Sequence, residues 1–151
     1  MAEIKGDPRS RSVGASPLAQ FRPIGRWVRI LVIVGALLIA MGAVIAQVHP
    51  AMLVSPQDEI NEAVHIYAGY LAARNLALAI MLFALLMAGA RRALANLMVL
   101  VALIQLLDVC MDVAEGRWAV APGVLVFGVV FLIAANRLTG CTFWKTEFWT
   151  G

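Results

Sequence analysis

Four long apolar segments, separated by short polar breaks, dominate the pattern along the chain. They cover about residues 27–47, 64–89, 93–113 and 118–136. A helix needs about 20 mainly apolar residues to cross the hydrocarbon core of a bilayer, and every one of these segments has about that length. The pattern therefore predicts an all-α membrane protein with four transmembrane helices.

The breaks on either side of the third segment are very short. Residues 90–92 separate it from the second segment, and residues 114–117 separate it from the fourth. Connections this short join antiparallel neighbours. We therefore expect the second, third and fourth spans to pack as consecutive hairpins, within an antiparallel four-helix bundle that makes up a transmembrane domain over residues 26–138.

A longer polar connection, residues 49–63, joins the first and second segments. It contains two prolines and three acidic residues. Within it, Ser55 and Pro56 followed by Asp58 and Glu59 are typical of a helix start, because proline suits the first turn and carboxylates stabilise the positive end of the helix dipole. We expect a loop here, with the second helix beginning before the hydrocarbon does.

The two ends of the chain differ in composition from the apolar segments. Residues 1–25 contain three prolines, several serines and little apolar periodicity, which predicts a disordered cytoplasmic arm. Residues 139–151 form a tail with the aromatic composition of a membrane interface, and its large rings are Phe143, Trp144, Phe148 and Trp149. We expect this tail to lie on the inner leaflet; an aromatic docking peptide for a partner protein is the alternative.

The first apolar segment follows a basic region, so a cleaved signal peptide is a second interpretation of it. Val44 and Ala46 would suit the small-residue cleavage site of such a leader. The segment is longer than the usual apolar region of about 7–15 residues, and the polar arm before it is long for a leader. We therefore favour a retained membrane anchor.

Composition and charge support a membrane protein and set its orientation. The chain is 62% hydrophobic and 14% charged, with a net charge of +3, against about 45–50% and 25% in soluble domains. Of its twelve Lys and Arg residues, all but Arg74 and Arg117 fall on the arm, the turn at residues 90–92 or the tail side. By the positive-inside rule we expect both termini in the cytoplasm of a multi-pass protein, in a bacterial cytoplasmic (inner) membrane. The basic residues follow topology and form no patch for nucleic acid, so no nucleic-acid partner is predicted.

The spacing of the Cys and His residues supports neither a metal site nor a disulfide. The chain has two cysteines, Cys110 and Cys141, and two histidines, none at the spacing of a metal site. The two cysteines fall at opposite ends of the predicted bundle, too far apart for a disulfide. We therefore predict neither a bound metal nor a cofactor.

The informative residues are the polar ones inside spans, because a charge at the centre of a bilayer costs about 2.5–3.5 kcal/mol or more. On the second span Tyr67, Tyr70 and Arg74 follow the spacing i, i+3, i+7, which places them on one helical face. Arg74 is followed by the polar Asn75 and lies about ten residues inside the span, roughly 15 Å deep. The second span thus carries a polar stripe that reaches the membrane midplane.

The third span carries a matching stripe at the same spacing, Gln105, Asp108 and Asp112. Antiparallel packing would bring both stripes into the outer half of the bilayer, where Asp108 is the natural counter-ion of Arg74. We expect the Gln105 amide and the Tyr70 hydroxyl to join the same polar network.

Two interpretations of this network remain open. In the first, Arg74 and Asp108 form a structural ion pair that fixes helix register, while Asp112 is solvated. In the second, the same residues line a small polar pocket, open toward the outer leaflet, that orients or protonates an apolar ligand.

Residues 67–108 resemble the DoxX-like families of four-helix membrane proteins. The resemblance rests on Arg-Asn-Leu-Ala-Leu-Ala at residues 74–79, the Arg91-Arg92 turn, and Gln-x-x-Asp at residues 105–108. Members of those families are mostly of uncharacterised function. The resemblance implies the four-helix fold and draws attention to Arg74 and Asp108, without implying a reaction.

Three classes of function fit these observations. The first is an accessory membrane protein that holds a lipid-like or quinone-like molecule in an outer-leaflet pocket. The second is a membrane enzyme, such as an isomerase or a redox-associated enzyme, with Asp108 exchanging a proton and Arg74 holding charge or ligand. The third is a proton or small-solute transporter, which four unbroken spans would support only as an oligomer; whether the chain forms homo- or hetero-oligomers is left open.

Overall fold

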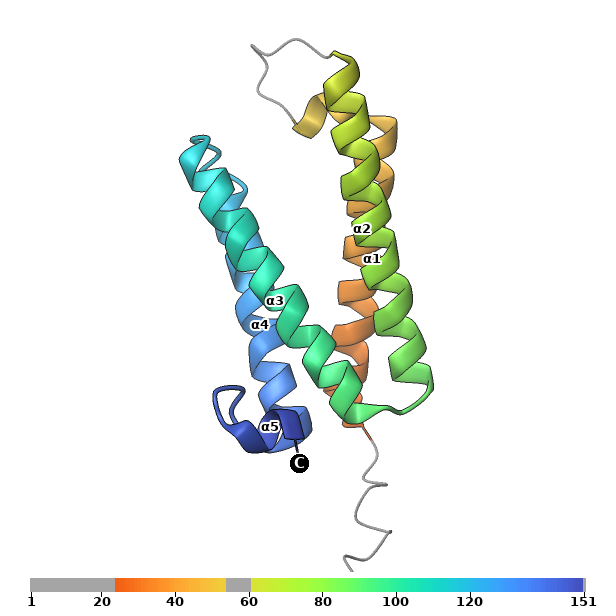
Figure 1. Cartoon of the computed structure of the whole chain (residues 1–151), viewed down its shortest axis with the longest axis vertical. Helices are drawn as coiled ribbons and strands as arrows, with labels where there is room; N and C mark the ends of the chain where they lie inside the picture. Colours follow the sequence, from red (N-terminus) through yellow and green to blue (C-terminus); the bar gives the residue numbers. More distant parts are fainter. Residues whose placement is uncertain (1–23, 54–60, 151) are drawn as a thin grey trace, which may run out of the picture.

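The computed structural model describes residues 24–53 and 61–150, and within this part it contains helices and no strand. The elements are α1 (Arg26–Val48), the short 3-10 helix η2 (Pro50–Leu53), α2 (Glu62–Met87), α3 (Arg91–Ala114), α4 (Ala121–Thr139) and α5 (Thr146–Thr150) (Figure 1). Almost all of the predicted arm over residues 1–25, and the predicted helix start at Ser55 to Glu59, lie outside the described residues.

Helices α1, α2, α3 and α4 are each long and apolar enough to cross a membrane, which confirms the prediction of four apolar helices of spanning length. The bounds differ slightly from the expected ones. α2 ends at Met87, before the expected residue 89, and α4 begins at Ala121, after the expected residue 118. Pro122 in the first turn explains the later start, since proline is favoured there and excluded further inside a helix.

Two glycines end helices by the same geometry. Gly89 after α2 and Gly116 after α3 both have a positive φ, 66° and 73°, which costs glycine little because it lacks a Cβ. After each glycine the chain turns back on the helix: the Ala90 amide donates to the Leu85 carbonyl at 3.1 Å, and the Arg117 amide donates to the Asp112 carbonyl at 2.7 Å. These are Schellman caps, and they aim the following residue back along the helix.

The helices pack as two pairs, α1 with α2 and α3 with α4. Figure 1 shows the two pairs diverging upward from the α2–α3 turn. We name the end at Gly89 the closed end, and the end at His49 and Glu115 the open end. The second and third spans are expected to pack as a hairpin; α2 and α3 do contact each other, but their main contacts are with α1 and α4.

Small residues explain why these pairs form. Ala43 and Ala46 of α1 are buried with Ala72 of α2 in the open half. In the other pair, a Cβ added to Gly128 of α4 would lie 3.3 Å from the Ala102 carbonyl oxygen of α3. Small residues allow helix backbones to approach closely in a membrane, as they do within each of these two pairs.

All four long helices meet in one core at the closed end. Its most deeply buried side chains include Val32 of α1, Leu82 of α2, Met98 of α3 and Phe131 of α4. Gly35 of α1 lies directly against the Phe131 ring, leaving no room for a Cβ. This core joins the two pairs at one end, so the space between them opens only at the other.

The aromatic tail folds back onto the closed end. Phe148 of α5 is 1% exposed and joins the core. The Asn136 side chain of α4 accepts a hydrogen bond from the Phe143 amide at 3.0 Å, and Trp149 Nε1 donates to the Phe143 carbonyl at 2.8 Å. Trp144 and Trp149 remain exposed, as rings at a membrane interface do.

Candidate ligand pocket

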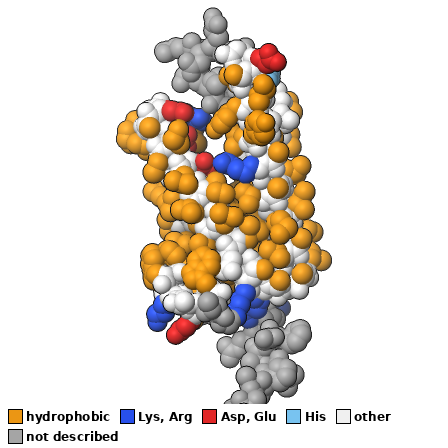
Figure 2. All heavy atoms as spheres, in the orientation of Figure 1, with side chains coloured by type: hydrophobic (Ala, Val, Ile, Leu, Met, Phe, Trp, Pro, Cys, Tyr) orange, Lys and Arg blue, Asp and Glu red, His pale blue; other side chains and the backbone are white. Residues whose placement is uncertain are grey.

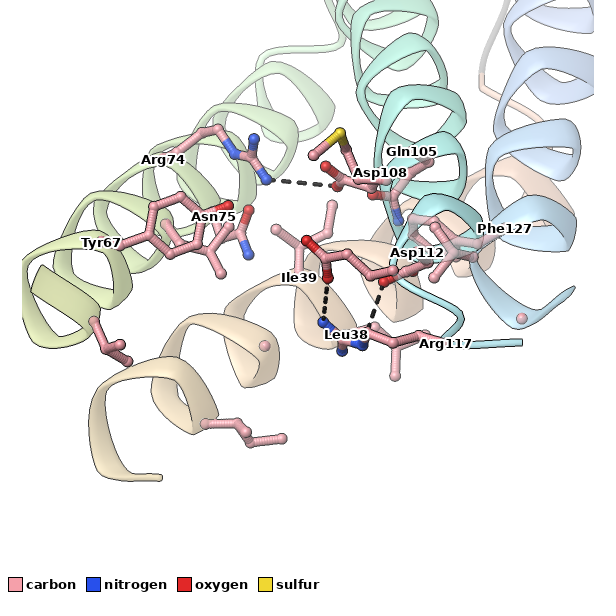
Figure 3. A pocket seen from close by; sticks show the side chains of 18 of the residues that line it. Leu38, Ile39, Tyr67, Arg74, Asn75, Gln105, Asp108, Asp112, Arg117 and Phe127 are labelled. Carbon is pink, nitrogen blue, oxygen red and sulfur yellow. Dashed lines mark hydrogen bonds and ion pairs between the residues drawn. The ribbon is translucent and has the colours of Figure 1, made fainter. Parts of the chain in front are cut away.

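A cavity of about 870 Å³ lies between the two helix pairs in the open half. All four long helices line it. Its apolar wall includes Leu38 and Ile39 of α1, Leu71 of α2, Met111 of α3 and Phe127 of α4. Figure 3 shows the charged side chains of α2 and α3 pointing toward one another across this space. The cavity therefore combines an apolar wall with a charged region.

Arg74 and Asp108 bridge α2 and α3 across the cavity. Arg74 Nη2 lies 3.5 Å from Asp108 Oδ2, and their side chains are 41% and 39% exposed (Figure 3). This distance is longer than the 2.7–2.9 Å or so of a tight charge-assisted hydrogen bond. The expected counter-ion relation is thus present, in a loose form that leaves both groups accessible from the cavity.

A second charged group forms where α3 ends. Arg117 Nε lies 3.6 Å from Asp112 Oδ1, and Arg117 Nη1 lies 3.7 Å from Glu115 Oε2. The Schellman cap at Gly116 turns the chain so that Arg117 faces back over the helix end. The Asp112 side chain is only 13% exposed, which does not fit the interpretation in which Arg74 and Asp108 are a structural pair and Asp112 is solvated.

Arg117 and Glu115 were not among the residues that the stripes single out. Both line the cavity. The signal for them is the Glu-Gly-Arg sequence at residues 115–117, since glycine just after a helix marks a C-cap. A cap of this kind returns the next side chain toward the last turn, where Asp112 lies.

The remaining polar residues of the stripes fall into two groups. Tyr67, Asn75 and Gln105 line the cavity, whereas Tyr70 does not. Tyr70 is 75% exposed and lies about 60° around the helix from Tyr67, at 100° per residue. The lining face of α2 therefore runs through positions 67, 71, 74 and 75, and the expected Tyr70 hydroxyl is absent from the network.

One glycine makes room for a polar amide of the pocket. A Cβ added to Gly128 of α4 would come within 3.2 Å of Gln105 Cβ, which is tighter than ordinary packing, whereas one added to Gly42 of α1 would make an ordinary contact of 3.7 Å with Asn75 Nδ2. Gly128 thus lets α3 and α4 approach closely beside Gln105.

Comparisons of the chain with protein-family models, with curated proteins and with solved structures found no match. Within residues 24–53 and 61–150, no group of three or more His, Cys, Asp or Glu side chains is placed to hold a metal ion. The cavity lining supplies two guanidinium groups, three carboxylates, side-chain amides and an apolar wall.

Such a set of groups suits an amphiphilic molecule. Ligand pockets of about 300–1,000 Å³ with a mostly apolar lining and a few polar groups are typical of small-molecule sites. The charged groups lie in the open half, and the apolar wall continues along α1 and α4. A ligand with a polar head and an apolar body would match both parts.

Proposed function

We propose that the protein is an accessory membrane protein that holds a lipid-like or quinone-like molecule in this pocket, which opens toward the outer leaflet. The observation that carries the proposal is the cavity of about 870 Å³ with facing ion pairs and an apolar wall. Ionisable groups inside membrane spans are costly and mark functional sites by default. A relation to the DoxX-like families is part of the same proposal.

The proposed orientation places the closed end in the cytoplasm of a bacterial cell, with both termini there and the helices in an antiparallel bundle. Arg91, Arg92, Arg137 and Lys145 belong to helix ends or connections at the closed end. Figure 2 shows Lys and Arg side chains gathered at that end, below a surface of mainly hydrophobic side chains. This distribution agrees with the positive-inside rule.

The orientation can be tested with single cysteines in a variant lacking Cys110 and Cys141. Glu62→Cys at the open end should react with a membrane-impermeant maleimide added outside intact cells or spheroplasts, and Arg92→Cys at the closed end should react only after the membrane is opened. Both positions are exposed, so accessibility reports the side of the membrane. The reverse labelling pattern would overturn the orientation, and labelling of both positions from outside would argue against alternate crossing.

The pocket can be tested by filling it. Gly123 of α4 lines the cavity, and a Cβ added there meets nothing within 4 Å. Gly123→Trp should therefore abolish retention of the ligand at little cost in thermal stability. The measurement is mass spectrometry of the molecules that remain bound after gentle detergent extraction, compared between this variant and the unmodified protein.

The matched control is Gly69→Trp. Gly69 of α2 also has open space at its Cβ and does not line the cavity. It should leave retention unchanged. If the unmodified protein retains only the bulk lipids of its membrane, in the same amounts as Gly123→Trp, the proposed function is wrong.

A membrane enzyme is the second candidate, favoured by the looseness of the Arg74–Asp108 contact. At 3.5 Å and about two-fifths exposed, the Asp108 carboxylate is open to a ligand in the cavity, so it could exchange a proton with one. This function differs from simple binding in requiring conversion of the retained molecule on incubation. Transport is less favoured, because Val32, Leu82 and Phe131 fill the closed end.

A further inference from the structure

Among the residues that the structure describes, the formal charges that face the pocket do not balance. Asp108, Asp112 and Glu115 contribute three carboxylates, and Arg74 and Arg117 contribute two guanidinium groups. Arg74 pairs with Asp108, while Arg117 is shared between Asp112 and Glu115. With all five groups ionised, the lining carries one negative charge in excess.

The hydrogen-bonding groups of these five side chains lean in the same direction. Each of the three carboxylates offers about four lone-pair sites, and each of the two guanidinium groups offers five N–H donors. The ion-pair distances of 3.5, 3.6 and 3.7 Å are long, so the carboxylate oxygens are only loosely engaged. With the excess negative charge, this favours a ligand that brings positive charge and hydrogen-bond donors.

The acceptors and the apolar wall lie close enough for one molecule to meet both. Figure 3 shows Asp108 and Asp112 on consecutive turns of α3, with Ile39 of α1 and Phe127 of α4 beside the same space. A compact headgroup between the two aspartates would leave its chain against these apolar side chains. A quinone head offers hydrogen-bond acceptors and no charge. It would therefore bond to the guanidinium and amide N–H groups of the lining and leave the carboxylates unused.

We propose that the headgroup of the ligand is a primary ammonium group carried on an apolar chain. This inference rests on the proposed pocket function and narrows the class of ligand. The ammonium group has three donors and no acceptor, so it can donate to carboxylate oxygens of Asp108 and Asp112, while Glu115 adds negative charge nearby. The ammonium group binds between α2 and α3, and the chain lies along α1 and α4.

Probes that differ only in the headgroup test this inference. We expect dodecylamine to bind the purified full-length protein at least about tenfold more tightly than dodecanol, because a unit charge pair at 4 Å is worth several kcal/mol at a protein surface. Dodecyltrimethylammonium, which has the charge without N–H donors, should fall between them. The readout is native mass spectrometry in a mild non-ionic detergent, titrated with each probe.

Variants of the lining should shift amine affinity in opposite directions. Asp112→Asn removes the excess charge and should weaken dodecylamine binding by about tenfold, and Arg117→Gln should strengthen it. Glu115→Gln makes the same charge change as Asp112→Asn at a side chain that is 52% exposed, and it serves if Asp112→Asn does not fold. Glu62→Gln is the control, because Glu62 is exposed at the same end and does not line the pocket.

The ammonium group can come from a membrane phospholipid with an ethanolamine head or from a free long-chain amine. Nanodiscs that contain phosphatidylethanolamine or phosphatidylcholine separate these sources. Selective retention of phosphatidylethanolamine, lost in Asp112→Asn, identifies the phospholipid. Equal retention of both lipids together with dodecylamine binding identifies a free amine.

The outcomes also separate this inference from the pocket function. Dodecanol or a decyl-chain quinone binding as tightly as dodecylamine, with Gly123→Trp abolishing all three, overturns the ammonium headgroup and keeps the pocket. An equal loss of affinity in Glu62→Gln and Asp112→Asn overturns the assignment to the lining. No binding of any probe, with Gly123→Trp unchanged from the unmodified protein, overturns both.

Discussion

Replacing either Arg74 or Asp108 by leucine should lower the free energy of unfolding by about 2 kcal/mol. An isolated charge at the centre of a membrane helix costs about 2.5–3.5 kcal/mol, and the 41% and 39% exposure of these side chains reduces that cost by screening. Each single variant leaves the partner charge unpaired between α2 and α3. The measurement is thermal or denaturant unfolding of the purified protein in detergent.

Exchanging the two charges separates stability from function. Arg74→Asp combined with Asp108→Arg restores an ion pair of the same kind, so most of the lost stability should return. Ligand retention should not return, because the charges then face the cavity from the opposite helices. Recovery of both properties would mean that the pair only fixes helix register. Arg92→Leu is the control, since Arg92 is an exposed arginine at the start of α3.

The second large effect is expected at Gly35. Gly35→Leu should destabilise the protein by about 3 kcal/mol, the upper part of the usual range for overpacking a filled core. A Cβ at this position collides with the Phe131 ring, and Phe131 is fully buried at the closed end. The ring can yield only by separating α1 from α4, which would loosen the core that holds the two helix pairs together.

Gly69→Leu provides the comparison for this substitution. Gly69 is also a helix-interior glycine, with nothing within 4 Å of an added Cβ, so leucine there should be neutral or stabilise the helix by up to about 1 kcal/mol. Thermal unfolding of both variants in the same detergent gives the difference. Equal melting temperatures would mean that the α1–α4 contact contributes little to stability.

The four spans could be predicted from the sequence because the length of an apolar run and the thickness of a bilayer determine them together. Arg74 and Asp108 could be paired for a similar reason, since a buried charge in hydrocarbon requires a partner. Neither argument depends on details of packing. The structure agrees with both, with four long helices and a contact of 3.5 Å between the two side chains.

The pairing of helices could not be predicted in this way. A short turn makes α2 and α3 neighbours in sequence, yet it does not decide how much of their length they share. That depends on where glycine and alanine let backbones approach, as at Gly128, and this is a property of two surfaces together. The sequence pattern wrongly includes Tyr70, which is exposed outside the lining face of its helix. It also does not reveal Arg117, which reaches the pocket through a backbone cap.

The unequal lengths of the helices have a consequence for the surrounding lipid. α2 has 26 residues and α4 has 19, which correspond at 1.5 Å per residue to about 39 Å and 28 Å. At about 28 Å, α4 matches the roughly 30 Å hydrocarbon core, whereas α2 exceeds it, and the α3–α4 pair is the lower of the two at the open end (Figure 1). In a bilayer that fits α4, the first turns of α2, which begin at Glu62, would therefore lie among the lipid headgroups.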